Sequence, residues 1–567
     1  MSEGVVRARV SGTMGGPRLL RPPIILDARG GVQGARHTDP AELNPTTGGI
    51  AFSGCRSVKL GEESLPGQGH VQNWRLPSDG ADCVENDEVK NRPALAPSSI
   101  TRRELLKRAG AAGALALGAP ALGIAQNQAQ PPKVKPGQEP KPESQAAQQY
   151  PHPPGVFINR PLTQITKAAE TLLDDLEGRA SDFFYNEASP RTGMVRDRAP
   201  AAGLSTSRVS SIAATGFGLT ALCIAHKRNY LQAYDCEQRV EKTLAFLLED
   251  CPHEHGFLYH FVDMESGQRM FGSELSSIDT ALLLCGVLTC RQYFAGNPRI
   301  EGLATTFYRR VDWEWMLNGG QTLSMGWLPD QGFLKHRWDI YSELLTMYLL
   351  AIGSPTHSIA AANWNDLQRP VVQFGGLDYI SGVAPLFIHQ YAHAWCDFRN
   401  VSDLHANYFT NSQAATRAHQ LWCLTESRRF PWFDQNLWGI TASDSREGYR
   451  VWGGPPAMGP LDGTLVPCAT GGSLIFLPAE CSHVLVSMNE QFDDKVYTRD
   501  GFVDAFQPKA NWFAPDILGI DQGITMLMAE NLRTGFVWEQ FMKNHEVGHA
   551  MSEVQFHPDP NALSQVM

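Results

Sequence analysis

The chain has 567 residues, 43% of them hydrophobic and 13 of them tryptophan, so it is long enough to bury a large core. Its formal net charge of −11, with no basic patch interleaved with aromatic residues beyond the N-terminal third, argues against a nucleic-acid partner. Its 11 cysteines are scattered and form no CxxC pair, which argues against a zinc ribbon or a thioredoxin-type site.

The N-terminal part of the chain carries no pattern of a folded domain. Residues 1–95 are rich in Gly, Pro, Arg and Ser without helical or alternating periodicity, so we expect a disordered or mis-assigned extension. Arg102 and Arg103 then precede a run of Ala, Gly and Leu at 109–125, an order typical of a twin-arginine signal segment at 96–126. We therefore expect a periplasmic or extracellular protein.

The apolar run of this segment is too weakly hydrophobic for stable membrane insertion, because a spanning helix needs about 20 strongly apolar residues. Residues 127–157 are rich in proline and predict a linker. No further linker interrupts residues 158–567, so we expect one compact domain there, and a monomer.

Helical periodicity dominates this domain. The predicted helices cover residues 162–187, 212–228, 236–248, 277–294, 341–352, 411–425 and 520–542. Strand signals are short, and the best of them predicts a small β-hairpin at 256–262. Many helices joined by long, polar loops predict an all-α fold of the (α/α)6 toroid or barrel type, in which the loops at one end form a cleft.

Residues 326–343 carry the densest set of polar and aromatic side chains. The stretch holds two tryptophans, a tyrosine, three bases and three acids. Rings cover the apolar faces of a pyranose, polar groups bind its hydroxyls and a carboxyl transfers a proton, so this pattern is typical of a sugar-binding cleft. Glu343 precedes an apolar helix, where partial desolvation would raise its pKa. The plainer alternative is an aromatic core edge beside a solvated loop.

Eight segments, in chain order, resemble a known family. They are ELSSIDTALLL at 274–284, MGWLPD at 325–330, WDIYSEL at 338–344, GSPTH at 353–357, PLFIHQY at 385–391, WGITASD at 438–444, GFVDAF at 501–506 and GIDQG at 519–523. Over residues 165–555 the chain resembles bacterial endo-β-1,2-glucanases of the glycoamylase-like glycoside hydrolases. The resemblance implies a single (α/α)6 catalytic domain, inverting cleavage of a β-glucan and no required metal or cofactor. Related members act on other linkages.

Inverting hydrolysis needs two carboxyl groups about 6.5–9.5 Å apart, one as acid and one to activate water. Glu343 and Glu274 fall where the resemblance implies catalytic acids, and the sequence leaves open which is the acid. Asp279 is the third residue of the candidate catalytic set and is expected to bind a hydroxyl or cap a loop. In the plainer alternatives, Glu274 only favours a helix N-terminus and Asp279 only binds backbone.

Seven further residues are candidates for substrate binding. The rings are expected to stack on sugars, the bases to bind hydroxyls and the aspartates to line the cleft: Trp327, Trp338, Tyr341, Lys335, Arg337, Asp444 and Asp521. Any one tryptophan can instead belong to the core, and the aspartates can instead form turns.

Three other functions compete with this interpretation. His545, Glu546 and His549 form an HExxH pattern that suits a zinc peptidase, but Gly548 weakens the helix and only 18 residues follow. A toroid that binds glycans without cleaving them, and a polysaccharide lyase, are the others. His389 and His393 share the i,i+4 spacing but lack the glutamate, and we expect them in the core or the cleft.

Overall fold

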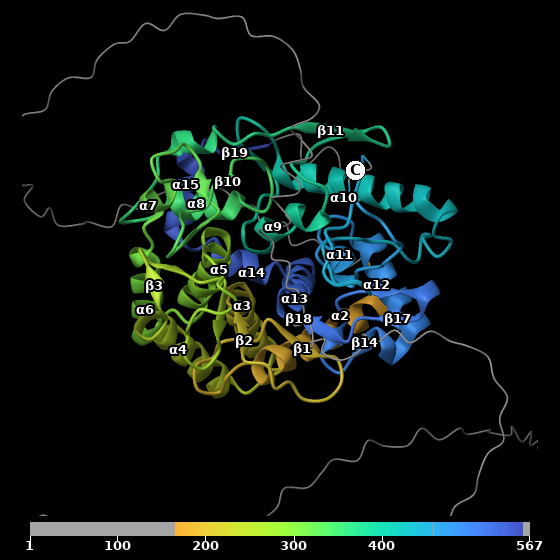
Figure 1. The fold of residues 1–567 in the computed structure, drawn as a ribbon, viewed down its shortest axis with the longest axis horizontal. Helices are drawn as coiled ribbons and strands as arrows, with labels where there is room; N and C mark the ends of the chain where they lie inside the picture. The colour runs from red at the N-terminus through yellow and green to blue at the C-terminus, as the bar shows by residue number, and fades with distance from the viewer. Residues whose placement is uncertain (1–164, 457–458, 560–567) are drawn as a thin grey trace, which may run out of the picture. The chain divides into compact units, whose positions relative to one another are not determined.

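The computed structural model describes residues 165–456 and 459–559 (Figure 1). The N-terminal extension predicted at 1–95, the signal segment at 96–126 and the linker at 127–157 lie outside these residues and stay predictions. No helix among the described residues is long and apolar enough to cross a bilayer.

Helices make up most of the regular structure. The long ones are α2 (Lys167–Asn186), α3 (Ile212–Arg228), α4 (Ala233–Glu249), α5 (Ser277–Tyr293), α6 (Pro298–Arg310), α10 (Tyr408–Thr425), α12 (Pro478–Phe492) and α13 (Gly519–Arg533). The short ones are α7 (Trp313–Leu317), α8 (Leu345–Ile352), α9 (Tyr391–Trp395), α11 (Pro467–Gly471), α14 (Phe536–Phe541) and α15 (His545–Glu553). The predicted helix-rich fold is therefore confirmed.

The helices are arranged in a central group and a surrounding group. Helices α3, α5, α9 and α13 lie in the middle of the view in Figure 1, with α4, α6, α10 and α12 around them. Helix α3 packs closely on α5 and α13, while α4 and α6 pack on α3 and α5. Buried apolar side chains from α2 to α15 form one continuous core, which is what a ring of packed helices requires.

Strands are more numerous than predicted, but each is very short. They are β1 (Arg198–Pro200), β2 (Val209–Ser211), β3 (His253–Glu254), β4 (Phe257–Leu258), β5 (Phe261–Asp263), β6 (Leu275–Ser276), β7 (Leu323–Ser324), β8 (Gly326–Leu328), β9 (Gly332–Phe333), β10 (Arg337–Trp338), β11 (Val371–Phe374), β12 (Leu377–Ile380), β13 (Val401–Ser402), β14 (Tyr497–Thr498), β15 (Gly501–Phe502), β16 (Phe506–Gln507), β17 (Trp512–Phe513), β18 (Asp516–Leu518) and β19 (His557–Pro558). All named pairs are antiparallel, and β6, β8 and β9 form a three-stranded sheet.

The hairpin predicted at 256–262 forms a few residues earlier. Strand β3 pairs with β4 through a turn in which His255 and Gly256 both have positive φ, the geometry that two-residue hairpins favour. The following strand, β5, does not join this hairpin; it pairs with β2. It therefore connects the hairpin to the start of α3.

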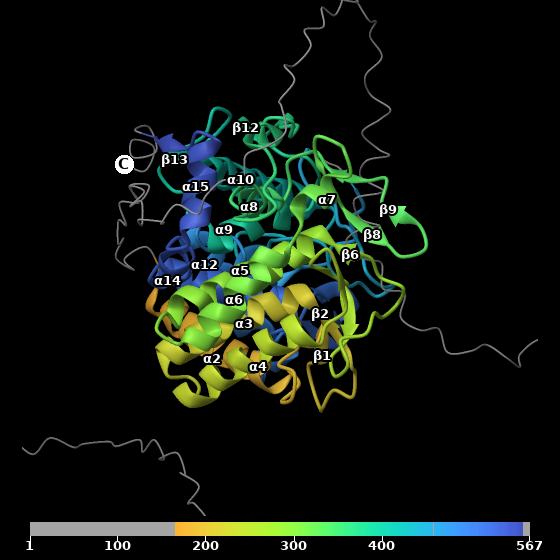
Figure 2. The ribbon, with the colours of Figure 1, turned by 90° about the vertical axis from the view of Figure 1, so that its left-hand side faces the viewer.

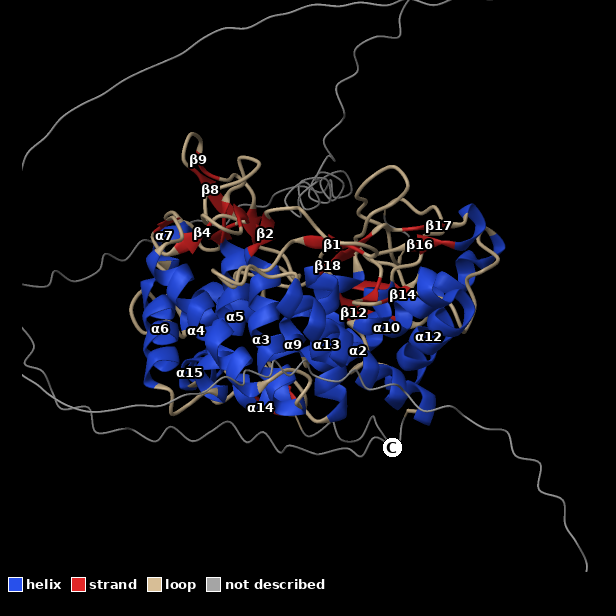
Figure 3. Cartoon of the chain, turned by 90° about the horizontal axis from the view of Figure 1, so that it is seen from below, coloured by secondary structure: helices blue, strands red, loops and turns tan. Residues whose placement is uncertain are grey.

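Most strands and long loops gather at one end of the helices. Figure 3 shows β1, β2, β4, β8 and β9 above the helix ends, and Figure 2 shows β1, β2, β6 and β8 beyond the same ends of α3 and α5. Strands β2, β6 and β18 lead directly into α3, α5 and α13. The first turns of these three central helices therefore open toward the loop-bearing end, where a cleft was expected.

The contact between α3 and α5 depends on two glycines. A Cβ atom at Gly216 would lie 2.6 Å from the Leu283 Cα atom, and one at Gly286 would lie 2.8 Å from the Gly216 carbonyl carbon. Backbone atoms cannot move aside as a flexible side chain can. The two helices therefore approach more closely than any larger residue would permit.

We expect Gly286→Ala to lower the free energy of unfolding by about 1–3 kcal/mol, because the added methyl group overpacks the α3–α5 contact. Gly302→Ala in α6 is the matched control, since no atom lies within 4 Å of a Cβ there. In that open helical position, alanine should raise the free energy of unfolding by about 0.5–1 kcal/mol. Urea unfolding of both variants measures the difference, and equal effects would contradict the packing argument.

Candidate active site

Two of the predicted catalytic carboxyls lie on either side of a histidine. The His260 Nδ1 atom is 3.6 Å from Glu274 Oε1, and its Nε2 atom is 3.6 Å from Asp279 Oδ2. All three side chains are buried, and Glu274 is only 5% exposed. The structure therefore brings Glu274 and Asp279 together. His260 was not singled out from the sequence, although it lies within the predicted hairpin.

Glu274 is positioned by the strand that precedes α5. The backbone N–H of His260 donates to the Glu274 carbonyl over 2.9 Å. On the neighbouring strand, Gly326 faces Ser276, and a Cβ at Gly326 would lie 2.9 Å from Glu274 Cγ. The glycine of the MGWLPD segment thus leaves the space that the Glu274 side chain occupies.

Asp279 lies in the first turn of α5 and helps to cap it. The Ser276 hydroxyl accepts the Asp279 backbone N–H over 3.2 Å and donates to Asp279 Oδ2 over 2.6 Å. A carboxylate in the first turn also interacts favourably with the helix dipole. Ser276 is therefore the N-cap of α5, and Asp279 accepts the Ser276 hydroxyl proton close to His260.

Glu343 lies two residues before α8 and is 1% exposed. Its segment is attached to the start of α5, because the Trp338 indole N–H donates to the Ser277 hydroxyl over 2.9 Å. Tyr348 donates to the Trp338 carbonyl over 2.7 Å and holds the segment from the other side. The segments that carry Glu343 and Glu274 are thus joined by a direct hydrogen bond at the start of α5.

The predicted stacking rings have different surroundings. Trp338 and Tyr341 are buried, and their ring faces are covered by protein. Trp327 is half-buried, with its ring centroid 5.9 Å from that of Trp315, which also packs on Phe333. Of the three predicted rings, only Trp327 retains exposed surface on which a sugar could stack.

The two predicted basic ligands also differ. Arg337 is half-buried and donates to the Leu317 carbonyl over 2.5 Å, to the Thr322 hydroxyl over 3.1 Å and to the Thr322 carbonyl. Its guanidinium thus fixes the loop after α7. Lys335 is exposed beside the β8–β9 hairpin. Lys335 is therefore the base that can reach a ligand without breaking an existing bond.

A second group of carboxyls lies near the start of α13. The Asp444 backbone N–H donates to Asp504 Oδ2 over 2.7 Å, and the Asp444 carboxylate accepts from Arg198 over 2.7 Å. Asp521, in the first turn of α13, is hydrogen-bonded to Asp504. The predicted Asp444 and Asp521 are therefore linked through Asp504. Asp504 lies in the quoted GFVDAF segment but was not singled out there.

Burial and the neighbouring charges of Asp521 and Asp444 raise the pKa of Asp504 well above its usual range. Asp504 is 1% exposed, and two carboxylates in contact cannot both be ionised at low cost. Burial and these neighbours therefore favour the protonated form of Asp504, whereas Asp444 forms an ion pair with Arg198.

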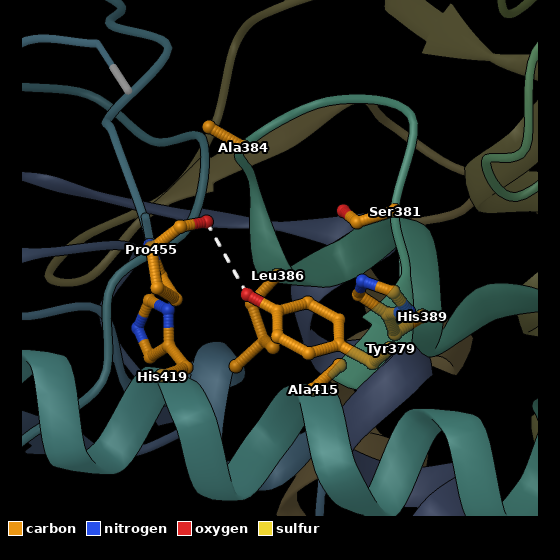
Figure 4. Close-up of a pocket in the computed structure, with 8 residues that line it drawn as sticks. All are labelled: Tyr379, Ser381, Ala384, Leu386, His389, Ala415, His419 and Pro455. Atoms are coloured by element: carbon orange, nitrogen blue, oxygen red, sulfur yellow. Dashed lines mark hydrogen bonds between the residues drawn. The ribbon is translucent and has the colours of Figure 1, made fainter. Parts of the chain in front are cut away.

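A small cavity is lined by side chains of β12, of α10 and of the segment 381–389 (Figure 4). Tyr379 donates to the Pro455 carbonyl over 3.3 Å, and the rings of His389 and His419 line the same space. The His389 Nδ1 atom is 3.2 Å from the Tyr341 hydroxyl. Burial lowers the pKa of both histidines to about 3, so they are neutral at physiological pH.

The geometry does not favour the zinc-peptidase alternative. Arg291 donates to both Glu546 carboxylate oxygens over 3.0 and 2.6 Å in the buried contact between α5 and α15, so Glu546 already has a structural partner. His545 and His549 are exposed on the other side of this short helix. Within 165–456 and 459–559, no three His, Cys, Asp or Glu side chains are placed to hold a metal ion.

Comparisons with known proteins agree with the motifs. Residues 335–545 match the Glycoamylase family model, described as "Putative glucoamylase". An exo β-1,2-glucooligosaccharide sophorohydrolase of Parabacteroides distasonis is 25% identical over 424 residues. These residues cover 68% of this chain and 58% of that protein, so the chain spans little more than half of this relative.

Solved structures agree as well. An endo-β-1,2-glucanase from Chitinophaga pinensis is 27% identical with a TM-score of 0.64, covering 69% of this chain and 98% of that one. A β-1,2-glucanase from Parabacteroides distasonis is 25% identical with a TM-score of 0.64, covering 68% and 60%. The chain is therefore similar to glycoamylase-like proteins and to β-1,2-glucanases. The resemblance inferred from the eight segments is confirmed.

We expect Asp504→Asn to flatten the dependence of stability on pH. Because the folded state binds the Asp504 proton more tightly than the unfolded state, the wild-type free energy of unfolding falls as pH rises above the unfolded pKa of about 3.9. Asparagine imitates the protonated acid and removes this loss. The free energy of unfolding of the variant should therefore rise relative to that of the wild type, by up to about 1.4 kcal/mol per pH unit between pH 5 and 8.

Denaturant unfolding at pH 5, 6.5 and 8 measures this gain. Asp494→Asn, at an exposed position, is the control and should follow the wild-type profile. Parallel profiles for wild type and Asp504→Asn would show that Asp504 does not carry the proton.

Proposed function

We propose that this glycoamylase-like protein hydrolyses internal linkages of β-1,2-glucan, with inversion at the anomeric carbon. The observation that carries the proposal is the gathering of buried carboxyls at the first turns of the central helices, with Glu274 and Glu343 on segments joined through Trp338 and Ser277. The β-1,2-glucan activities named for the relatives support the substrate. Export by the predicted twin-arginine segment at 96–126 would bring the protein to such a polymer.

The helices also support the finer architecture. We propose an (α/α)6 barrel in which α3, α5, α8, α9, α11 and α13 form the inner ring and α2, α4, α6, α15, α10 and α12 form the outer ring. Inner and outer helices alternate along most of the chain, and each outer helix from α2 to α6 packs on an inner neighbour. Helix α15 comes from the C-terminal part and packs on α8, which otherwise has no following outer helix.

Glu274 and Glu343 supply the general acid and the general base in this proposal. Burial favours the protonated form of a carboxyl, which the acid requires, while the base must reach water on the opposite face of the sugar. His260 orients Glu274 and Asp279 by lying between them. Buried Trp338 and Tyr341 shape the wall of the site, while Trp327, Lys335 and Asp444 keep surface for sugar contacts.

Hydrolysis of glucans with β-1,2, β-1,3, β-1,4 and α-1,4 linkages tests the reaction and its substrate together. We expect reducing ends from β-1,2-glucan only, products of mixed length from the earliest time points, and initial α-anomers by NMR, since inversion of a β-linkage gives α. Release of a single disaccharide from the ends of the glucan would show that the protein is exo-acting and does not cleave internal linkages. Inactivity on every glucan would contradict the hydrolase proposal.

We expect Glu343→Gln to lower kcat on β-1,2-glucan by at least about 10²–10⁴-fold, because general acid or base catalysis contributes that much. The substitution keeps the size of the side chain, so the melting temperature should change little. Glu539→Gln, at an exposed position on α14, is the isosteric control and should retain wild-type turnover. Near-wild-type turnover in Glu343→Gln would remove this residue from the mechanism.

A further inference from the structure

Phe271 presents an apolar ring to solvent from an unfavourable backbone conformation. Its surface is 63% exposed, and its φ of 54° lies in the left-handed region. Single exposed apolar side chains are common on proteins and need no special explanation. A bulky aromatic residue in the left-handed region is a rare outlier, and such strain gathers at ligand-binding sites.

The turn around Phe271 is held in place by its neighbours. Arg269 donates from Nε to the Ser273 carbonyl over 2.5 Å and from Nη2 to the Gly272 carbonyl over 2.6 Å. The Ser273 backbone N–H donates to the Met270 carbonyl over 2.9 Å. These bonds order the backbone of the turn from which the ring projects.

The ring of Phe271 is the outermost of three that lead to the carboxyls. Its centroid lies 6.0 Å from that of Phe261, with the rings at 76°. Phe261 in turn stacks on His260 at 4.0 Å and 15°. His260 contacts Glu274 and Asp279, as described above. An exposed ring on an ordered turn thus stands at the end of a continuous aromatic row that begins beside the candidate catalytic residues.

We propose that Phe271 is a substrate-binding platform on which a glucosyl unit stacks at a subsite remote from the cleaved linkage. This inference rests on the proposed function. The apolar C–H face of a pyranose suits an exposed aromatic ring, whereas its hydroxyls need polar partners. The ring is two aromatic neighbours away from the carboxyls, so it binds chains long enough to extend past the cleavage site and contributes little to short ones.

The experiment compares Phe271→Gly and Phe271→Tyr with wild type on long β-1,2-glucan and on the shortest oligosaccharide that wild type cleaves. Glycine removes the ring and relieves the positive φ, so the variant should fold; tyrosine keeps the ring. Tyr234→Ala is the control, because Tyr234 is 68% exposed on α4 and belongs to no such row.

We expect Phe271→Gly to raise KM for the long glucan about tenfold with kcat within about twofold, since a binding contact away from the reacting atoms is lost. The KM for the shortest substrate should change far less, and Phe271→Tyr should keep the wild-type KM for the long glucan. The platform would be overturned if Phe271→Gly left the KM for long glucan unchanged or raised the KM equally for both substrate lengths. It would also be overturned if Phe271→Tyr raised the KM as much as Phe271→Gly does.

The wild-type protein separates this inference from the proposed function. Activity on β-1,2-glucan with no effect of Phe271→Gly would overturn the platform and leave the hydrolase standing. Inactivity of wild type on every glucan would overturn the proposed function, and the platform with it.

Discussion

Carboxyl groups inside a packed ring of helices must each be compensated, because an isolated buried charge costs several kcal/mol. The described residues use several kinds of compensation at one end of the central helices. Glu274 and Asp279 share His260, Asp444 has Arg198, and the raised pKa of Asp504 favours its neutral form. The first turns of α5 and α13 add a favourable dipole for Asp279 and Asp521. Acid–base chemistry is possible at this end because burial and compensation separate protonated from ionised groups.

The short strands and close helix packing put these groups within reach of one another. Strands β2, β6 and β18 deliver the chain to the first turns of α3, α5 and α13, so side chains distant in sequence converge. The tight α3–α5 contact at Gly216 and Gly286 keeps those first turns close. Positive φ angles occur in turns and at helix ends, among them Phe271 near the candidate site and Asn229 at the end of α3.

Helix positions were predictable where local signals were strong. Helix α3 spans its predicted residues because Ser211 caps its start and Asn229 ends it in the left-handed conformation. The single helix predicted at 520–542 is wrong in its C-terminal half, because Gly535 has a φ of 72° and separates α13 from α14. Helix α6 was missed, although Asn297 before Pro298 is a readable start signal. Two-residue strands escape any periodicity argument, since they are stabilised by partners far away in sequence.

The site was predictable as a set of segments but less so as a set of roles. Motif position indicated Glu274, Glu343 and Asp444, yet only the tertiary contacts connect Glu274 to His260 and Asp444 to Asp504. Whether a tryptophan is a platform or core depends on what covers its faces, which is why Trp338 could not be distinguished from Trp327.

A crystal structure of the Glu343→Gln variant with a β-1,2-linked glucan oligosaccharide tests the central claim most directly. The account predicts that the sugar chain crosses the loop-bearing end, with one glycosidic oxygen beside residue 343 and Glu274 within about 10 Å across the sugar ring. Ordered sugar bound elsewhere, with neither side chain near a glycosidic oxygen, would contradict it.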